Sequence, residues 1–167
     1  MKNYRFYSFV NRLYMSHVQW GIQTAHCVSS MMAAAFRAQG EEGGAERLAD
    51  VLAWAEQSPT IMICDGLNVG RLLELEASIG ALAKTFGLPF AAFREDQQSL
   101  GGVITAVSIL VPEEFFDVDV ERADGQAPVF LRKGSEDGSV LSAIITEQSD
   151  PERHALMSAI KLCELAR

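Results

Sequence analysis

The residues best suited to chemistry begin with a polar stripe in the first fifth of the chain. Gln19, Gln23, His26 and Ser30 are spaced by four, three and four residues, so a helix would place them one above another on one side. Two amides and an imidazole on one face can orient an ester, move a proton or donate to a phosphate. Core packing does not require such a stripe, although His26 could equally hydrogen-bond a neighbouring loop.

A second group of polar residues surrounds a loop near the middle of the chain. Asp96 follows an apolar segment, and a carboxylate at the end of a strand can act as a general base or simply cap its own loop. Arg94 would share a face with Asp96 in an extended segment. Gly101 and Gly102 could bring backbone N–H groups close to an anion, or serve an ordinary turn. Thr105 begins the next apolar segment and is a further candidate.

The remaining histidines are weaker candidates. His17 would lie in the first turn of a helix, where the helix dipole disfavours a cation, so its neutral form is expected. His154 is expected in solvent. Cys27 adjoins His26, but adjacent helical positions point about 100° apart, so the two side chains cannot readily cooperate.

The bulk composition is that of one globular domain. The chain has 167 residues, of which 49% are apolar, and its three cysteines are far apart in the sequence. These features favour reduced, buried thiols in a cytoplasmic protein, and no metal or other cofactor is expected. No secretory signal or membrane-spanning stretch is expected. The net charge of −8 argues against a broad nucleic-acid surface but leaves room for a local basic patch.

The periodicity predicts the elements that must position these residues. Ser16 and Gln19 form a capping box, which predicts a helix over 17–39 with an apolar stripe at Val18, Ile22, Ala25, Ser29, Met32 and Phe36. Further helices are predicted over 46–57, over 67–86 and after a cap at Ser149 or Asp150. Strands are predicted over 3–10, 60–64, 89–94 and 103–111, with 60–64 in a central, fully buried position.

This alternation predicts an α/β fold, with a mixed four-stranded sheet covered by helices on both faces. Residues 113–147 change character, because Asp117–Glu121 alternates with period two and Asp124–Gly125 is a hairpin signal. We therefore expect a single domain over 1–167, with 113–147 as a small antiparallel β appendage inserted into it. This appendage could bind a protein partner.

The layout resembles the type 2 peptidyl-tRNA hydrolase family. Gln23-Thr-Ala-His26 matches the Gln-x-x-His part of the helical motif of that family. Phe86-Gly-Leu-Pro89 leading to Asp96 is similar to the family's path into a strand that ends in Asp. The strand from Thr105 to Pro112 corresponds to the next one. The resemblance covers about residues 3–112 and the last helix, and it implies a catalytic set of Asp96, His26, Gln23 and Thr105.

The departures from the family concern its charged and polar positions. Gln19 stands where the active-site lysine of the family is expected, and Gln98 and Leu100 replace a glycine and a threonine. Gln19, His17, Arg94, Gly101 and Gly102 would then contact the ligand, with Arg94 or Arg12 replacing the missing cation.

Three functions remain open. The first is hydrolysis of the ester between peptide and tRNA. The second is non-catalytic binding of a small nucleotide-like ligand. The third is a role as an acidic protein-interaction factor. A homodimer is also compatible with the sequence.

Overall fold

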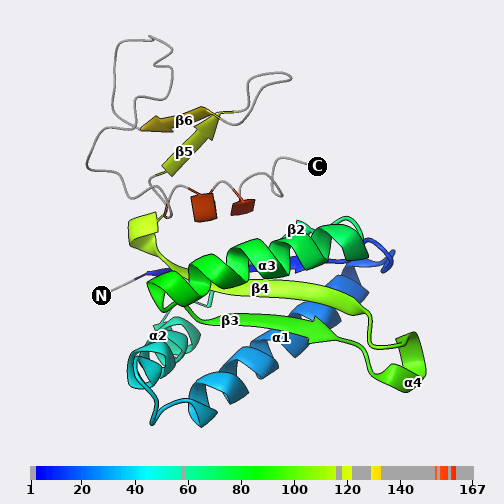
Figure 1. Cartoon of the computed structure of the whole chain (residues 1–167), viewed down its shortest axis with the longest axis horizontal. Coiled ribbons are helices and arrows are strands. Elements are labelled where there is room, and N and C mark those ends of the chain that lie inside the picture. The colour runs from blue at the N-terminus through cyan, green and yellow to red at the C-terminus, as the bar shows by residue number, and fades with distance from the viewer. Residues whose placement is uncertain are drawn as a thin grey trace.

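The sheet at the centre of the protein has four strands in the order β2-β1-β4-β3. The computed structural model describes residues 3–57, 59–115, 118–121 and 129–132, together with 153, 155–157 and 159–160. The strands are β1 (Tyr4–Val10), β2 (Ile61–Asp65), β3 (Phe90–Arg94) and β4 (Ile104–Pro112). β1 pairs parallel with β2, and β4 runs antiparallel to β1 and β3. The predicted mixed four-stranded sheet is confirmed (Figure 1).

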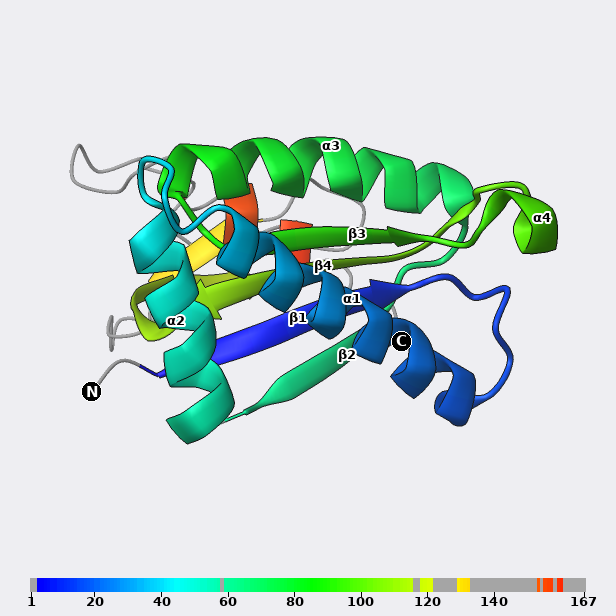
Figure 2. The same ribbon diagram turned by 90° about the horizontal axis from the view of Figure 1, so that it is seen from below.

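Helices cover both faces of this sheet, as predicted. α1 (His17–Arg37) and α2 (Gly44–Gln57) lie on one face, and α3 (Val69–Phe86) lies on the other (Figures 1 and 2). The core accordingly has two parts. One lies between α3 and the sheet around Phe9, Leu72 and Ile109, and the other lies between the sheet and the pair α1 and α2, around Phe6 and Trp54. Within the described part of the chain, no helix combines the length and the apolar character needed to cross a membrane.

The ends of the helices follow their capping residues. The Ser16 hydroxyl oxygen accepts from the Gln19 backbone N–H at 3.2 Å, as the capping box predicts. The reciprocal contact is different, because the Ser16 hydroxyl donates to the Gln19 side-chain oxygen. Asn68 caps the start of α3, and Gly87 ends it with a φ of 66°, in the left-handed region that favours glycine.

The face by which α1 packs differs from the apolar stripe in the sequence. Val18, Ile22 and Phe36 are 74%, 50% and 49% exposed. The buried positions of α1 are instead Gln23, Thr24, Cys27, Met31 and Ala35. The reason is that the sheet presents hydroxyl groups at this point, and the Thr24 and Ser108 hydroxyls both donate to the Ser8 oxygen at 3.0 Å. Polar side chains on α1 are thus buried without losing their hydrogen bonds.

The predicted central position of the strand over 60–64 is wrong. Among the strands that the structure describes, β2 pairs only with β1 and lies at one edge of the sheet. Its first two residues, Ile61 and Met62, are 42% and 36% exposed, whereas Cys64 and Asp65 are buried. Helices bury only the carboxyl half of β2. There Ile63 packs against the core on the side of α1 and α2, and Cys64 packs against the core on the α3 side.

The segment after β4 begins inside the core. A short 3-10 helix, η1 (Glu113–Phe115), buries Phe115, whose ring makes an edge contact with Phe86 at 5.3 Å between centroids. β5 (Val118–Glu121) and β6 (Val129–Arg132) form a separate antiparallel pair, as expected for the appendage. The hairpin signal at 124–125 and residues 133–147 of the expected appendage lie outside the described residues, as do His154 and Cys163. The described part of the last helix buries Leu156 and Ile160 against the α3 side.

Candidate functional site

Two of the predicted site residues are in direct contact. Gln23 lies on α1 and Thr105 lies on β4, and both side chains are buried. The Thr105 hydroxyl donates to the Gln23 side-chain oxygen at 2.8 Å. The contact fixes the orientation of the Gln23 amide, because its oxygen accepts from Thr105 and its nitrogen must therefore point away from β4.

The Gln23 nitrogen donates to Glu95, a residue that the sequence did not single out as a site residue. The distance to Glu95 Oε1 is 3.0 Å, and the Tyr14 hydroxyl donates to the same oxygen at 2.6 Å. Burial, followed by the hydrogen bond to Glu95, raises the pKa of Tyr14 to about 12. A continuous hydrogen-bonded chain therefore runs from Tyr14 through Glu95 and Gln23 to Thr105. The other oxygen of Glu95 accepts from no described residue.

His26 lies beside this chain on the exposed side of α1. Its ring stacks on Phe93 of β3, with 4.3 Å between the centroids and 10° between the planes. The imidazole is thus held in place through one face while the residue stays exposed. Within the described part of the chain the ring nitrogens accept and donate no hydrogen bond, and Glu95 and Asp96 follow Phe93 in the sequence.

Asp96 is exposed and organises the loop that follows it. Its side-chain oxygen accepts from the Gln98 backbone N–H at 2.8 Å, and its carbonyl accepts from the N–H groups of Leu100 and Gly102. These contacts close the short helix α4 (Gln97–Leu100), which lies inside the segment expected to be a polar loop. Asp96 therefore performs the loop-capping role, and its side chain is exposed.

The two glycines of this loop are required by its backbone. Gly101 and Gly102 have φ values of 64° and 73°. A Cβ at position 102 would lie 2.7 Å from the Gln97 side-chain oxygen. The Gly102 N–H already donates to Asp96, so this N–H group is occupied and does not point at a ligand.

The two arginines considered as replacements for the family lysine both have carboxylate partners. Arg94 forms two hydrogen bonds to Glu76 of α3, at 3.1 and 2.7 Å, and so lies on the α3 side of β3, whereas Phe93 and Glu95 contact α1. Arg12 is paired with Asp65, whose other oxygen accepts from the Leu67 N–H at 2.8 Å. Neither guanidinium contacts Gln23, His26 or Thr105.

His17 and Gln19 lie away from this chain of hydrogen bonds. Gln19 is exposed and serves the cap of α1. His17 makes an edge contact with Trp20, and the two residues line a cleft of about 310 Å³ together with Ile63 and Asp65. The structure therefore places the named residues apart: Gln23 and Thr105 lie in the hydrogen-bonded chain, His26 is exposed on Phe93, Asp96 is exposed in its loop, and His17 lies in this second cleft.

The thiol of Cys27 is unsuited to nucleophilic chemistry. Cys27 is fully buried, and burial raises its pKa to about 11. Among the residues that the structure describes, no group of three His, Cys, Asp or Glu side chains is arranged to hold a metal ion.

Glu95 could have been found from the alternation of side chains along an extended strand. Glu95 comes directly after β3 and contacts α1 on the same side as Phe93, so a prediction that placed Phe93 against α1 and continued the alternation would have placed Glu95 there too. Tyr14 gave no local signal, because its partner lies 81 residues away. No known protein family matches this sequence, and no curated protein matches it significantly.

Proposed function

We propose that this protein is a divergent relative of the type 2 peptidyl-tRNA hydrolases and hydrolyses the ester between a peptide and tRNA. The observation that carries the proposal is the hydrogen bond between Gln23 and Thr105. These are two of the residues by which the sequence resembles that family, and they lie 82 residues apart in the chain. The substrate would place the protein in the cytoplasm.

Each residue has a chemical role in the proposal. A carboxylate, Asp96 or the adjacent Glu95, takes a proton from the attacking water, and His26 hydrogen-bonds the substrate. The Gln23 and Thr105 pair holds Glu95 in position, since the Gln23 amide nitrogen donates to its carboxylate. The oxygen of Glu95 that accepts from no described residue is the one that would receive the proton.

A specific observation favours a second candidate, the non-catalytic binding of a small nucleotide-like ligand. Arg12 and Arg94 are both paired with carboxylates, and Gln19 stands where a lysine is expected. None of these three residues therefore supplies a cation that could stabilise a developing oxyanion. Binding without turnover needs no such cation. The acidic segment 113–147 remains the candidate for a protein partner.

Turnover of peptidyl-tRNA by the full chain tests the proposal. Asp96→Asn and Glu95→Gln remove one carboxylate each at nearly constant shape, and loss of a general base lowers the rate about 10²–10⁴-fold. Glu56→Gln is the matched control, because Glu56 is exposed near the end of α2, away from the site. His26→Ala should weaken both rate and binding.

Gln19→Lys separates the two candidate functions. It restores the family lysine and costs about 1 kcal/mol at most through the helix cap. An inactive parent that gains activity on this change is a degenerate hydrolase. If neither protein turns over peptidyl-tRNA while Asp96→Asn weakens the binding of a nucleotide, the binding function replaces the hydrolase.

A further inference from the structure

The outer face of α1 carries an apolar stripe that the fold of one copy does not use. Val18, Ile22, Ala25, Ser29, Met32 and Phe36 follow one another at intervals of four, three, four, three and four residues. Most of them are exposed, Val18 by 74% and Ile22 by 50%, and only Met32 is partly packed on the core. In Figure 2, α1 lies across the sheet with this outer side toward the viewer.

The stripe has the spacing by which one helix packs on another. Alternating intervals of three and four residues form the seam of a coiled coil, in which side chains of one helix fill gaps in its partner. α1 has 21 residues and so offers a seam about 30 Å long. A contiguous stripe of exposed apolar side chains marks an interaction surface, whereas isolated ones do not.

The charges around the stripe indicate what covers it. Between residues 16 and 40 only Arg37 carries a formal charge, although the whole chain has a net charge of −8. An acidic or basic partner would find no complementary charge on this face. A second copy supplies an uncharged helix with the same spacing, and two acidic molecules repel each other least where both lack carboxylates. We propose that two copies of this chain pair through the outer faces of α1.

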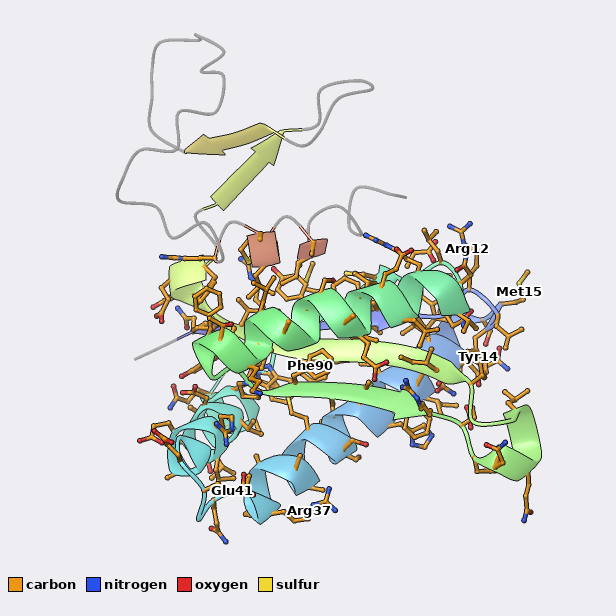
Figure 3. All side chains as sticks on the ribbon, viewed as in Figure 1. Arg12, Tyr14, Met15, Arg37, Glu41 and Phe90 are labelled. Atoms are coloured by element: carbon orange, nitrogen blue, oxygen red, sulfur yellow. The ribbon has the colours of Figure 1, made fainter. Side chains whose placement is uncertain are left out.

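The ends of α1 favour an antiparallel pair. The first turn of α1 holds no acidic residue, and the exposed Glu41 and Glu42 follow its carboxyl end. Figure 3 shows Arg37 and Glu41 at one end of the molecule and Met15 at the other. Antiparallel pairing keeps Arg37, Glu41 and Glu42 of the two copies at opposite ends of the pair, whereas parallel pairing sets these like charges side by side. The register that we propose sets Ala25 against the partner's Ser29. Both side chains are small, so the two helices can approach closely at this point.

Sedimentation velocity of the full chain over a range of concentrations tests the pairing. The wild-type protein should change reversibly from monomer to dimer, and Ile22→Glu should weaken the dimer by more than about tenfold because it buries two like charges. Leu73→Glu is the matched control, since Leu73 is 46% exposed on α3 over the opposite face of the sheet, and this variant should dimerise like the wild type. Equal dimerisation of the Ile22→Glu and wild-type proteins would overturn the proposal.

Cross-linking tests the orientation. Ala25→Cys and Ser29→Cys variants, each with Cys163 replaced by serine, are mixed under oxidising conditions. An antiparallel pair gives mainly the mixed 25–29 disulfide, whereas a parallel pair gives 25–25 and 29–29 disulfides and contradicts the register. A wild-type protein that stays monomeric at every concentration, and that Ile22→Glu destabilises against urea, would show that a segment of the same chain covers the stripe. That result would overturn the proposal.

Discussion

The Thr105 hydroxyl donates a 2.8 Å hydrogen bond to the Gln23 side-chain oxygen, and this contact ties β4 to α1 inside the protein. Both residues are buried, at 0% and 5% exposure. The contact decides the direction of the Gln23 amide and through it the contact with Glu95. Stability and the candidate site therefore share the same two side chains.

Replacing Thr105 should destabilise the fold. Thr105→Val keeps the shape but leaves the buried Gln23 oxygen without its donor, which costs about 1–3 kcal/mol in the free energy of unfolding. Urea denaturation measures the loss. Thr85→Val is the control, because Thr85 is exposed on α3 and its hydroxyl donates to the carbonyl of Ala81 in the same helix. Adding Gln23→Leu should recover part of the loss, since both polar partners are then absent, and strict additivity would contradict the contact.

The Tyr14 hydroxyl should make stability depend on alkaline pH. Its folded-state pKa of about 12 lies above the unfolded value of 10.0, through burial first and the hydrogen bond to Glu95 second. Tyr14 therefore contributes stability that is fully present below pH 10 and is lost as the pH rises toward 12. Denaturant unfolding between these values should show a smaller decline for Tyr14→Phe than for the wild type. An identical decline in the two proteins would contradict the raised pKa.

The turn between α1 and α2 should not tolerate a side chain at Gly44. A Cβ at this position would lie 1.7 Å from the carbonyl oxygen of Ala38, so the backbone must move. Overpacking of this kind costs about 1–3 kcal/mol or more. Gly40→Ala is the control, since a Cβ there meets nothing within 4 Å. Thermal unfolding of the two variants should differ clearly, and equal midpoints would argue against this path of the turn.

The boundary of the appendage should lie after Phe115. Phe115 is buried against Phe86, and the guanidinium of Arg153 lies 4.8 Å from the centre of its ring. These contacts bring the two ends of the segment close together, so a short linker in place of 118–147 should leave cooperative unfolding intact. Phe115→Ala in the same shortened chain should cost about 3–5 kcal/mol. Loss of cooperative unfolding on deletion alone would make the appendage part of the core.

The sequence determined the elements that depend on neighbouring residues. The start of α1 at Ser16 and the end of α3 at Gly87 follow from hydrogen bonds and backbone angles within a few residues. Such contacts form between groups that are already close along the chain, so they need no knowledge of the fold. The apolar, β-branched run from Val103 to Val111 likewise predicted a strand, and β4 forms there with every residue buried.

Only the tertiary structure decided which faces and edges are covered. α1 carries apolar residues on two sides. It packs on the sheet by the side with Gln23, Thr24 and Cys27, because serine and threonine hydroxyls of the sheet form hydrogen bonds with these side chains. The order of the described strands likewise puts β2 at an edge, which no local pattern could reveal. The partners of Glu95 lie 72 and 81 residues away. Contacts at such separations depend on the path of the whole chain, so residue spacing alone does not encode them.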